Sequence, residues 1–572
     1  MTLHHSALHP PRPAGGRDRV RGNDYRVLRR PDPFTPTLRV SVVVPAYGGQ
    51  DKLDLVLAAL ARQTYPDELV EVIVVDNGST PPLRLPEERP RDTRLIVCET
   101  PGRASARNAG LAEAGGDVIH WLDSDVLLTP GAIEAHMRWH HAAPYCVVTG
   151  YIRFTDAPVP AALPDDLERA FEPAEPHGWI VDLVERTGGL TDNPQRPFSL
   201  HVGGATSVGA RLVEAAGPMD EDLILGQDTE LGYRLAQAGA VFVPEPAARA
   251  YHLGPTMRMR DKQPIDRVSH AFVADRIPAY RWLRSHPGRQ WKVPYVAAVV
   301  DGTAGYENVR AAVDALLAGT VPDVEVVVVG PWDTLDRPLR DRRAPLRDPA
   351  LDLVLVHGHY LHEGRVRLAT APDVDPAVPY VLRLPPGWVP GEDSLARLLD
   401  LCREQGYGLV NVLLHESPDG VLAARLERVA AFARARVVLR PGEDLDDAVD
   451  DVSGVTWVEG ETYGFGTEPA DIPGRRSAHR ARVEARAEAE RLAKEAERLR
   501  AQVTKWREEA ARWRKSTVEL RREVGTLRRR LAAANRAQQG LRVLVATTVR
   551  RALGRGSRGR PGAPPEAGDT LP

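Results

Sequence analysis

The sequence predicts an α/β protein with two successive sheet-forming units and a long C-terminal coiled-coil helix. From about residue 38 to residue 465, short β-branched runs alternate with stretches of helical spacing. From about Arg475 the composition changes to Ala, Glu, Arg and Leu, with apolar residues recurring every seven positions. At 572 residues the chain is long enough for two or three domains with sizeable cores.

The elements of the first unit follow one another as strand, helix, strand, helix and strand. Residues 40–49, VSVVVPAYGG, predict a buried strand that opens into a loop at its Pro and Gly residues. Residues 51–63 then place Leu and Val at helical spacing, and 70–75 forms a second buried strand. A helical stretch over 104–114 leads into the apolar run 118–122. Such elements with short links predict parallel strands joined by right-handed crossovers.

Two carboxylates, Asp123 and Asp125, follow the third strand one residue apart. Residues i and i+2 of a strand point the same way, so both carboxylates can face one hard cation. A divalent metal held by only one or two protein carboxylates usually takes its other ligands from water and substrate phosphate. The pair therefore favours a site for a nucleoside-diphosphate substrate. The alternative is a solvated acidic turn at the end of a strand.

Other residues of interest follow the first two strands in the same way. Pro45 and Tyr47 end the first strand, and Asp76 and Asn77 end the second. The carboxyl ends of parallel strands share one edge of a sheet, where open α/β sheets bind their ligands. The sequence therefore places these residues and Asp123 along one rim.

Four ordered motifs, VVVPAY, VIVVDNGS, GRASARNAGL and LDSD, resemble the nucleotide-sugar half of family-2 inverting glycosyltransferases of the A-type fold. The resemblance covers roughly residues 38–255. It implies a nucleotide-sugar-binding A-type sheet, a divalent metal (Mn or Mg) and a sugar transfer that inverts the anomeric carbon. UDP is the nucleotide that the resemblance favours, with GDP and dTDP left open.

The resemblance also implies roles for individual residues. The expected donor-binding residues are Pro45, Tyr47, Asp76, Asn77, Arg103, Arg107 and Asp123. The expected metal ligands are Asp125 directly, Asp123 through metal-bound water, and His252. Arginine suits phosphate because its guanidinium matches phosphate oxygens in pairs. The alternative for Arg107 and Asn108 is a polar pair on the surface of a helix.

The acceptor half is expected around Asp228, the predicted general base. Residues 217–235 resemble the family segment in which an acidic residue opens a helix beside the acceptor. The family usually has Glu-Asp there, but this chain has Gln227 before Asp228, which puts acceptor affinity or choice in doubt. Gly203 and Gly204 lie in a glycine-bearing strand where an acceptor sugar can approach closely. The alternative for Asp228 is a helix N-cap.

Residues 296–332 echo residues 40–79 and predict a second A-type unit. The chemistry of this repeat looks erased. Gly330 ends its second strand in place of an aspartate, and Pro385-Pro386 replaces the acidic pair. We interpret it as a degenerate copy used for packing, acceptor binding or assembly. The alternative is an α/β domain of unrelated origin.

The long C-terminal segment carries an apolar seam. From Leu492 to Leu541 an apolar residue stands at every seventh position. A second set of mostly apolar residues with the same spacing begins four positions later, at Ala496. This seam predicts a coiled coil that forms a homo-oligomer or binds a partner. Trp506 and Trp513 at seam positions leave its strand number and orientation open.

After the coil, residues 541–560 carry six arginines and no acidic residue, interleaved with Leu and Val. Peripheral contact with an anionic membrane would suit this pattern, and would suit a lipid-linked acceptor. The alternative is a loose basic tail. The predicted boundaries are 1–37 for a disordered N-terminal segment, 38–290 for the catalytic domain, 291–465 for the degenerate unit, 475–541 for the coil and 542–572 for the tail.

Composition excludes several classes of protein. A net charge of −3 and the lack of a recognition module argue against nucleic acid as a partner. The three cysteines have no paired or metal-type spacing, which fits a reducing compartment. No run approaches the roughly 20 apolar residues of a membrane span, and the N-terminal segment does not resemble a secretion signal. We therefore expect a cytoplasmic protein, at most at the inner face of the cell membrane.

These observations predict a metal-dependent inverting glycosyltransferase. It would move a sugar from a nucleotide-sugar donor to a hydroxyl group of a saccharide or lipid-linked acceptor, in cell envelope polysaccharide or glycoconjugate synthesis. One alternative is a non-catalytic scaffold or binding protein built on this fold and assembled through its coil. Another is a nucleotidyltransferase, which the lack of a Gly-rich triphosphate loop after the first strand disfavours.

Overall fold

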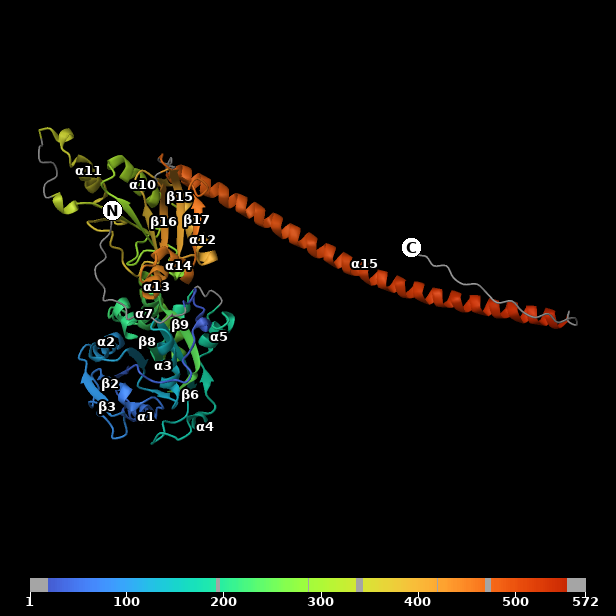
Figure 1. Ribbon diagram of the computed structural model, residues 1–572, viewed down its shortest axis with the longest axis horizontal. Coiled ribbons are helices and arrows are strands. Elements are labelled where there is room, and N and C mark those ends of the chain that lie inside the picture. Colours follow the sequence, from blue (N-terminus) through green and yellow to red (C-terminus); the bar gives the residue numbers. More distant parts are fainter. Residues whose placement is uncertain are drawn as a thin grey trace. The chain divides into compact units, whose positions relative to one another are not determined.

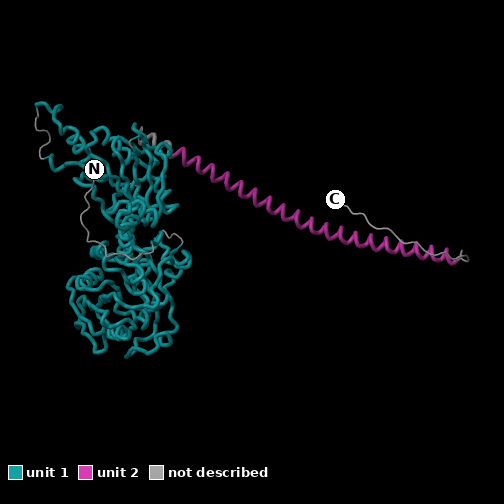
Figure 2. Tube along the Cα trace, in the orientation of Figure 1, with its two compact units in different colours: residues 1–472 teal, residues 473–572 magenta. Residues whose placement is uncertain are grey.

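The computed structural model describes residues 19–191, 196–286, 288–335, 343–418, 420–468 and 475–552, with side chains from residue 483 onward in the last range. The chain divides into two units, residues 1–472 and 473–572 (Figure 2). The first unit contains two large sheets, and the second is one long helix (Figure 1).

The first sheet has nine strands of mixed direction. Four of them run parallel in the order β3-β2-β1-β4, namely β1 (Val40–Ala46), β2 (Val70–Asp76), β3 (Asp92–Val97) and β4 (Val118–Leu122). The others follow in the order β8-β6-β9-β5, with β7 beside β6, namely β5 (Val126–Leu128), β6 (Cys146–Thr155), β7 (Glu175–Pro176), β8 (Ala205–Gly209) and β9 (Val241–Leu253). The parallel arrangement predicted for β1, β2 and β4 is confirmed. The sheet as a whole is mixed, because β8 runs antiparallel to both β4 and β6.

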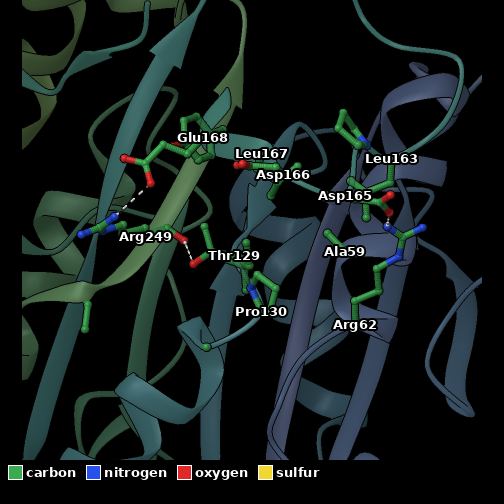
Figure 3. A pocket seen from close by; sticks show the side chains of 15 residues that line it. Ala59, Arg62, Thr129, Pro130, Leu163, Asp165, Asp166, Leu167, Glu168 and Arg249 are labelled. Carbon is green, nitrogen blue, oxygen red and sulfur yellow. Dashed lines mark hydrogen bonds and ion pairs between the residues drawn. The ribbon is translucent and has the colours of Figure 1, made fainter. Parts of the chain in front are cut away.

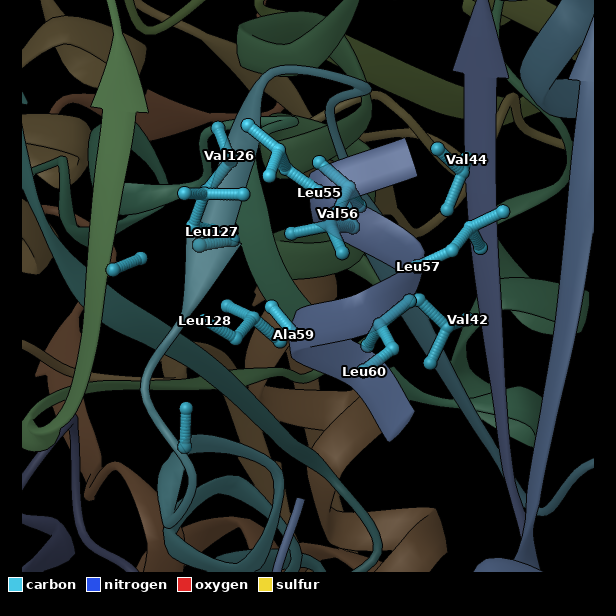
Figure 4. Packing of buried hydrophobic residues seen from close by; sticks show 14 of the residues in the cluster. Val42, Val44, Leu55, Val56, Leu57, Ala59, Leu60, Val126, Leu127 and Leu128 are labelled. Carbon is cyan, nitrogen blue, oxygen red and sulfur yellow. The ribbon is translucent and has the colours of Figure 1, made fainter. Parts of the chain in front are cut away.

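The α-helices of this part are α1 (Gln50–Ala61), α2 (Arg103–Glu113), α3 (Ala132–Ala142), α4 (Leu167–Phe171), α5 (Gly178–Arg186), α6 (Ala210–Ala216), α7 (Gln227–Gln237), α8 (Met257–Arg260) and α9 (Lys262–Arg276). Short 3₁₀ turns lie at η1 (Tyr25–Val27), η2 (Asp67–Leu69), η3 (Pro197–Leu200) and η4 (Arg281–Leu283). Helix α1 is apolar on two sides because it packs between two strands. Leu57 and Leu60 point toward β1, and Ala59 points toward β5 (Figure 4).

The second sheet has seven strands in the order β12-β11-β10-β13-β16-β15-β17. Its strands are β10 (Val296–Asp301), β11 (Val324–Val329), β12 (Val366–Ala369), β13 (Tyr380–Leu384), β15 (Leu409–Ser417), β16 (Gly420–Arg428) and β17 (Val455–Glu459), and a separate pair joins β14 (Val389–Pro390) to β18 (Phe465–Gly466). Its helices are α10 (Tyr306–Ala318), α11 (Leu351–Tyr360), α12 (Ser394–Gln405), α13 (Val429–Val438) and α14 (Leu445–Val452), with 3₁₀ turns η5 (Trp332–Thr334) and η6 (Pro345–Arg347).

The two sheets share strand order and strand direction. β10 pairs in parallel with β11 and β13, as β1 does with β2 and β4. β16 is antiparallel to both its neighbours, as β8 is, and β17 is parallel to β15, as β9 is to β6. The helix α2 of the first sheet has no counterpart between β12 and β13.

The N-terminal segment differs from its prediction as a disordered stretch. Residues 1–18 lie outside the described residues, but residues 19–37 are described and partly buried. Val20 joins a hydrophobic cluster with Val241 of β9 in the first sheet and Val449 of helix α14. Asn23 also exchanges hydrogen bonds with the backbone of Phe242 at 2.8 and 2.9 Å. The prediction fails here because these partners are distant in sequence.

The second unit is helix α15 (Arg475–Ala552), 78 residues long. It runs past the predicted end of the coil at residue 541, and residues 553–572 of the predicted tail lie outside the described residues. Side chains of the apolar seam are largely exposed, with Leu499 at 54% and Trp513 at 74%. In the described part of the chain, no helix is long and apolar enough to cross a membrane.

Candidate active site

Arg107 of α2 joins two carboxylates from different parts of the first sheet. Its guanidinium is buried and donates through Nη1 to Asp228 Oδ1 at 2.5 Å and through Nη2 to Asp123 Oδ1 at 2.8 Å. Both carboxylate side chains remain about one third exposed. The expected base and the first aspartate of the acidic pair therefore lie in one site. Because Arg107 is enclosed and paired, the alternative of a polar pair on the surface of a helix is wrong for it, and its expected place near the base or diphosphate of the donor stays a prediction.

Gly203 makes room for this arginine. A Cβ atom at residue 203 would lie 2.2 Å from Arg107 Nη2, and the Gly203 carbonyl accepts from the same nitrogen at 3.0 Å. A Cβ at Gly204 would lie 3.2 Å from Asp123 Oδ2. Lack of a side chain at residue 203 thus admits the guanidinium, whereas the sequence favoured an acceptor sugar there.

The two carboxylates that pair with Arg107, Asp228 and Asp123, have pKa values shifted in opposite directions. Burial raises the pKa of Asp228, but the charges of Arg107, His201 and Arg103 outweigh it, and the net pKa lies below the usual value. Burial also raises the pKa of Asp123. Arg107 and Arg103 oppose that rise, Asp125 adds to it, and the net pKa is above the usual value. Asp228 is therefore ionised at neutral pH, as a general base must be.

Asp125 and His252 face each other across paired strands, since Val126 of β5 lies opposite His252 of β9. His252 Nε2 lies 3.4 Å from Asp125 Oδ1. His252 Nδ1 is 2.8 Å from the carbonyl oxygen of Gly254, which can only accept, so this nitrogen carries the proton. Nε2 is therefore the ring nitrogen that faces the carboxylate. His252 lies within β9, which extends well beyond the predicted strand over 240–244.

This pair fits a divalent cation that takes the rest of its shell from substrate. A carboxylate oxygen and a neutral imidazole nitrogen are ligands that both Mn and Mg accept. Among the described residues, no group of three or more His, Cys, Asp or Glu is placed to hold a metal. Asp123 is paired with Arg107 instead. The protein would supply Asp125 and His252, and water and phosphate would supply the other ligands.

Lys52 is a residue of this site that the sequence reasoning missed. Its Nζ donates to the Leu253 carbonyl at 2.7 Å and lies 3.6 Å from Asp125 Oδ2. It lies in the first turn of α1, where the helix dipole disfavours a cation. A lysine at this unfavourable position was the sequence signal for a role in the site, because it indicates that its ammonium group binds a partner outside the helix.

Asp76 and Asn77 shape loops at the rim. The Asp76 carboxylate accepts from the backbone nitrogens of Ser79 at 2.8 Å and Leu83 at 3.0 Å. Burial raises its pKa, but these hydrogen bonds outweigh burial and lower it. The Asn77 amide bonds to the backbone of Cys98, Thr100 and Gly102, which fixes the start of α2. Their carboxylate and amide groups are thus engaged by the backbone, where the prediction had them facing the donor.

Other predicted donor residues remain open to a ligand. Tyr47 is 78% exposed beyond the end of β1, and Pro45 is half-buried within that strand. Arg103 is exposed at the first position of α2, and its charge reaches both Asp123 and Asp228. These residues line the edge at which β1 and β4 end.

The first turn of α7 holds Gln227 and Asp228. The N-cap of this helix is Gly226, with a φ of 94°, so the alternative of Asp228 as N-cap is wrong. Gln227 is buried, and its Nε2 donates to the Ile224 carbonyl at 3.2 Å. The Gln227 side chain therefore bonds to the loop before α7, and its expected contact with an acceptor stays a prediction.

A cavity of about 620 Å³ lies elsewhere on the first sheet (Figure 3). None of the predicted site residues lines it. Its charged side chains pair with one another, Arg249 with Glu168 and Arg62 with Asp165, each at 3.4 Å. The candidate active site is therefore the open strand edge.

Residues 41–191 match the family model "Glycosyl transferase family 2". The uncharacterised glycosyltransferase YfnE of Bacillus subtilis (strain 168) is 28% identical over 244 residues, 36% of this chain and 62% of that protein. Validoxylamine A glucosyltransferase of Streptomyces hygroscopicus subsp. limoneus is 32% identical over 291 residues, 47% of this chain and 62% of that protein. The chain thus spans about three fifths of these curated relatives. The family match and these relatives together support a family-2 glycosyltransferase.

Proposed function

We propose that this chain transfers a sugar from a nucleoside-diphosphate sugar, most suitably UDP-linked, to a hydroxyl group of a saccharide or lipid-linked acceptor. The observation that carries the proposal is the double pairing of Arg107. It brings Asp228 of α7 and Asp123 at the end of β4 into one site, beside Asp125 and His252. A donor at the strand edge would thus lie next to a carboxylate base.

The reaction needs one base and one departing diphosphate. The acceptor oxygen forms a bond to the anomeric carbon as the bond from that carbon to the diphosphate oxygen breaks, and the bonding electrons leave with the nucleoside diphosphate. Asp228, ionised and one third exposed, accepts the hydroxyl proton. A single displacement of this kind inverts the anomeric carbon.

Positive charge beside the leaving group would come from the protein and from a metal. Asp125 and His252 would hold Mn or Mg, which neutralises charge that develops on the diphosphate. Arg103 and Lys52 add fixed cations at the same edge. This supports the expected roles of Arg103 and Asp125, with Asp123 bound to Arg107 and not to the cation.

The second sheet supports the proposal of a degenerate copy. Its strands repeat the order and directions of the first sheet. The ring of Trp332 lies against Gly302 and Gly330, where a Cβ would approach it to 2.7 and 2.8 Å. Trp332 thus fills the crevice between the ends of β10 and β11, where a nucleotide would otherwise enter.

The exposed seam of α15 supports a coiled coil between copies or with a partner. A coil near a membrane surface, with the arginines at the end of α15, would suit an enzyme of envelope polysaccharide synthesis at the inner face of the membrane. Sedimentation with anionic vesicles, with and without residues 541–572, tests this. Equal pelleting of both forms contradicts membrane contact.

A binding scaffold is the second candidate function. It is favoured by Gln227, which replaces the family's first carboxylate, and by the second sheet, where Pro385-Pro386 stands in place of the acidic pair. A scaffold would bind a nucleotide or saccharide without releasing a product.

The test is nucleoside-diphosphate release from a panel of sugar nucleotides, with Mn and with Mg. We expect release that needs the metal and that falls in Asp125→Ala and Asp228→Ala. Release of pyrophosphate is measured as a control for nucleotidyl transfer, and release of free phosphate as a control for phosphate hydrolysis. Silence across the panel, together with no calorimetric binding of UDP and Mn, contradicts the transferase and favours the scaffold.

A further inference from the structure

Helix α7 is held at two places by the part of the chain that contains the second sheet, namely helix α13 and the turn before β13, although its first turn belongs to the candidate active site of the first sheet. Arg434 of α13 reaches the chain just beyond the C-terminal end of α7, where its Nε donates to the Gly239 carbonyl at 2.8 Å and its Nη2 donates to the Ala240 carbonyl. Tyr233, in the middle of α7, donates through its hydroxyl to the Ala377 carbonyl at 2.6 Å. Figure 1 shows α13 between the second sheet and α7.

Arg434 is an unusual group to bury. It is 8% exposed, and its third hydrogen-bond partner is the carbonyl of Gly22 in the N-terminal segment. In the described residues no carboxylate forms an ion pair with it. Burial lowers its pKa to about 10, so it stays charged at neutral pH. Its three acceptors are backbone carbonyls, of Gly22, Gly239 and Ala240, and hydrogen bonds to a charged group of this kind are about twice as strong as neutral ones, which compensates the burial of the cation.

The backbones also meet closely at this point. Gly239 has a φ of 93°, and a Cβ there would lie 2.6 Å from the backbone nitrogen of Arg434. Helix α13 is therefore in direct contact with the turn that ends α7. Any movement of α13 along α7 would carry this turn with it.

We propose that Arg434 is a positioning residue for Asp228, and that the second sheet acts by holding α7 in register with the donor edge. This inference depends on the proposed transferase function. An α-helix transmits an axial shift along its length, and Asp228 lies about 15 Å from the end that Arg434 holds. A base misplaced by about 1 Å can cost about a hundredfold in rate.

The donor side of the site is not carried by α7. Tyr47, Arg103 and Asp125 lie on or next to β1, α2 and β4. Loss of the Arg434 contacts therefore affects proton removal from the acceptor and leaves nucleotide binding intact. This separation distinguishes positioning from a general loss of structure.

The experiment compares full-length wild type with Arg434→Met, Arg434→Lys and the control Arg436→Met. Arg436 lies two residues along α13 with an exposed side chain, and its guanidinium lies over the ring of Phe432. Three quantities are measured: kcat for transfer, Kd for UDP with Mn by calorimetry, and hydrogen exchange of the α7 and α2 amides.

We expect Arg434→Met to lower kcat by about tenfold or more, with the Kd for UDP unchanged and faster exchange in α7 but not in α2. Arg434→Lys keeps the charge but has fewer hydrogen-bond donors, so its kcat should lie between those of Arg434→Met and wild type. Arg436→Met should match wild type.

Two results overturn the inference in an active protein. One is a wild-type kcat in folded Arg434→Met. The other is a loss of kcat that comes with weaker UDP binding and faster exchange in both helices. A wild type that releases nucleotide from no sugar nucleotide contradicts the proposed function itself, and Arg434 then has only the structural role that α7 exchange would report.

Discussion

The two sheets of the first unit have the same strand order, yet their strand ends carry different residues. β2 ends in Asp76 where β11 is followed by Gly330, and β4 is followed by Asp123 and Asp125 where β13 is followed by Pro385-Pro386. The buried strands of both sheets are rich in Val and Leu, which preserve the frame. The comparison teaches that the site depends on a few residues at strand ends. The same arrangement of strands can exist without those residues.

An aromatic side chain lies at the ends of β10 and β11 in the second sheet. Trp332 is anchored by its indole Nε1, which donates to the Val328 carbonyl at 3.0 Å. Its ring lies against Gly330, the residue that corresponds to Asp76. The first sheet thus has an aspartate whose carboxylate organises a loop at this position, whereas the second has a glycine against which an aromatic ring lies.

The largest effect is expected for the proposed base. Asp228→Asn keeps the size of the side chain but removes the proton acceptor, and transfer should fall about a thousandfold. The matched change in the second sheet is Asp301→Asn, at the end of β10, where the carboxylate bonds to Thr303. That variant should leave kcat at the wild-type value. Equal loss in both would contradict the assignment of chemistry to the first sheet.

Removing Arg107 should cost stability as well as activity. Arg107→Met leaves two carboxylates without their shared cation, and we expect a loss of about 3 kcal/mol in the free energy of unfolding. We expect a value at the lower end of the range for broken buried ion pairs, because both carboxylates are partly exposed to solvent. Arg367→Met in β12 breaks an exposed pair with Glu325 and should cost about 0.5 kcal/mol. Urea denaturation measures both, and similar losses would contradict the buried bridge.

Opening the crevice of the second sheet should not create a second nucleotide site. Trp332→Ala is expected to lower the free energy of unfolding by about 2 kcal/mol, since the ring is only partly buried. UDP titration with Mn should still give a single site, because no carboxylate lies at the ends of β11 and β13. A second binding event in Trp332→Ala would show that the copy keeps more of its binding surface than we infer.

The last prediction concerns an effect that is absent at neutral pH, and it rests on three buried histidines, one in β4 and two in α3. His136 and His140 both bond to Ser207, and burial lowers the pKa of His140 to about 3 and that of His120 to about 4. The unfolded chain binds protons near pH 6.5, so stability is full above that pH and falls as the pH drops toward 4. One histidine accounts for at most about 1.4 kcal/mol per pH unit.

His140→Gln isolates one of these groups. Glutamine can keep a hydrogen bond to Ser207 and does not titrate, so the variant should lose less stability than wild type between pH 6.5 and pH 5. The measurement is the urea midpoint at several pH values. Parallel curves for the two proteins would contradict the buried neutral state of His140.

The sequence predicted the parts whose cause is local. β1, β2, α1 and β4 were found because runs of Val and Leu bounded by Pro, Gly or Asp define them, and their ends agree within a few residues. The proximity of Asp125 and His252 agrees with the family resemblance. β3 was missed because it is a half-exposed edge strand with charged residues.

Parts that depend on distant partners could not be predicted. The type and motif of Arg107 predicted a residue near the donor phosphates, but they gave no sign of its pairing with Asp228, 121 residues away. Lys52 depends in the same way on Leu253. Val20 and Asn23 carry no local signal of order, and only their partners in the folded chain bury them.

The contact between Gly22 and Arg434 has a consequence for the order of synthesis. Gly22 is made 412 residues before the arginine that binds its carbonyl, and it also bonds to Val452 at 2.9 Å. Domains made on the ribosome generally fold as units, from the N-terminal side first. While the chain is being made, the first sheet therefore lacks these contacts. The end of α7 and the N-terminal segment gain them only after α13 and α14 have left the ribosome. A ribosome stalled before α13 would therefore carry a first sheet whose strands are paired but whose α7 and N-terminal segment lack the hydrogen bonds from Arg434.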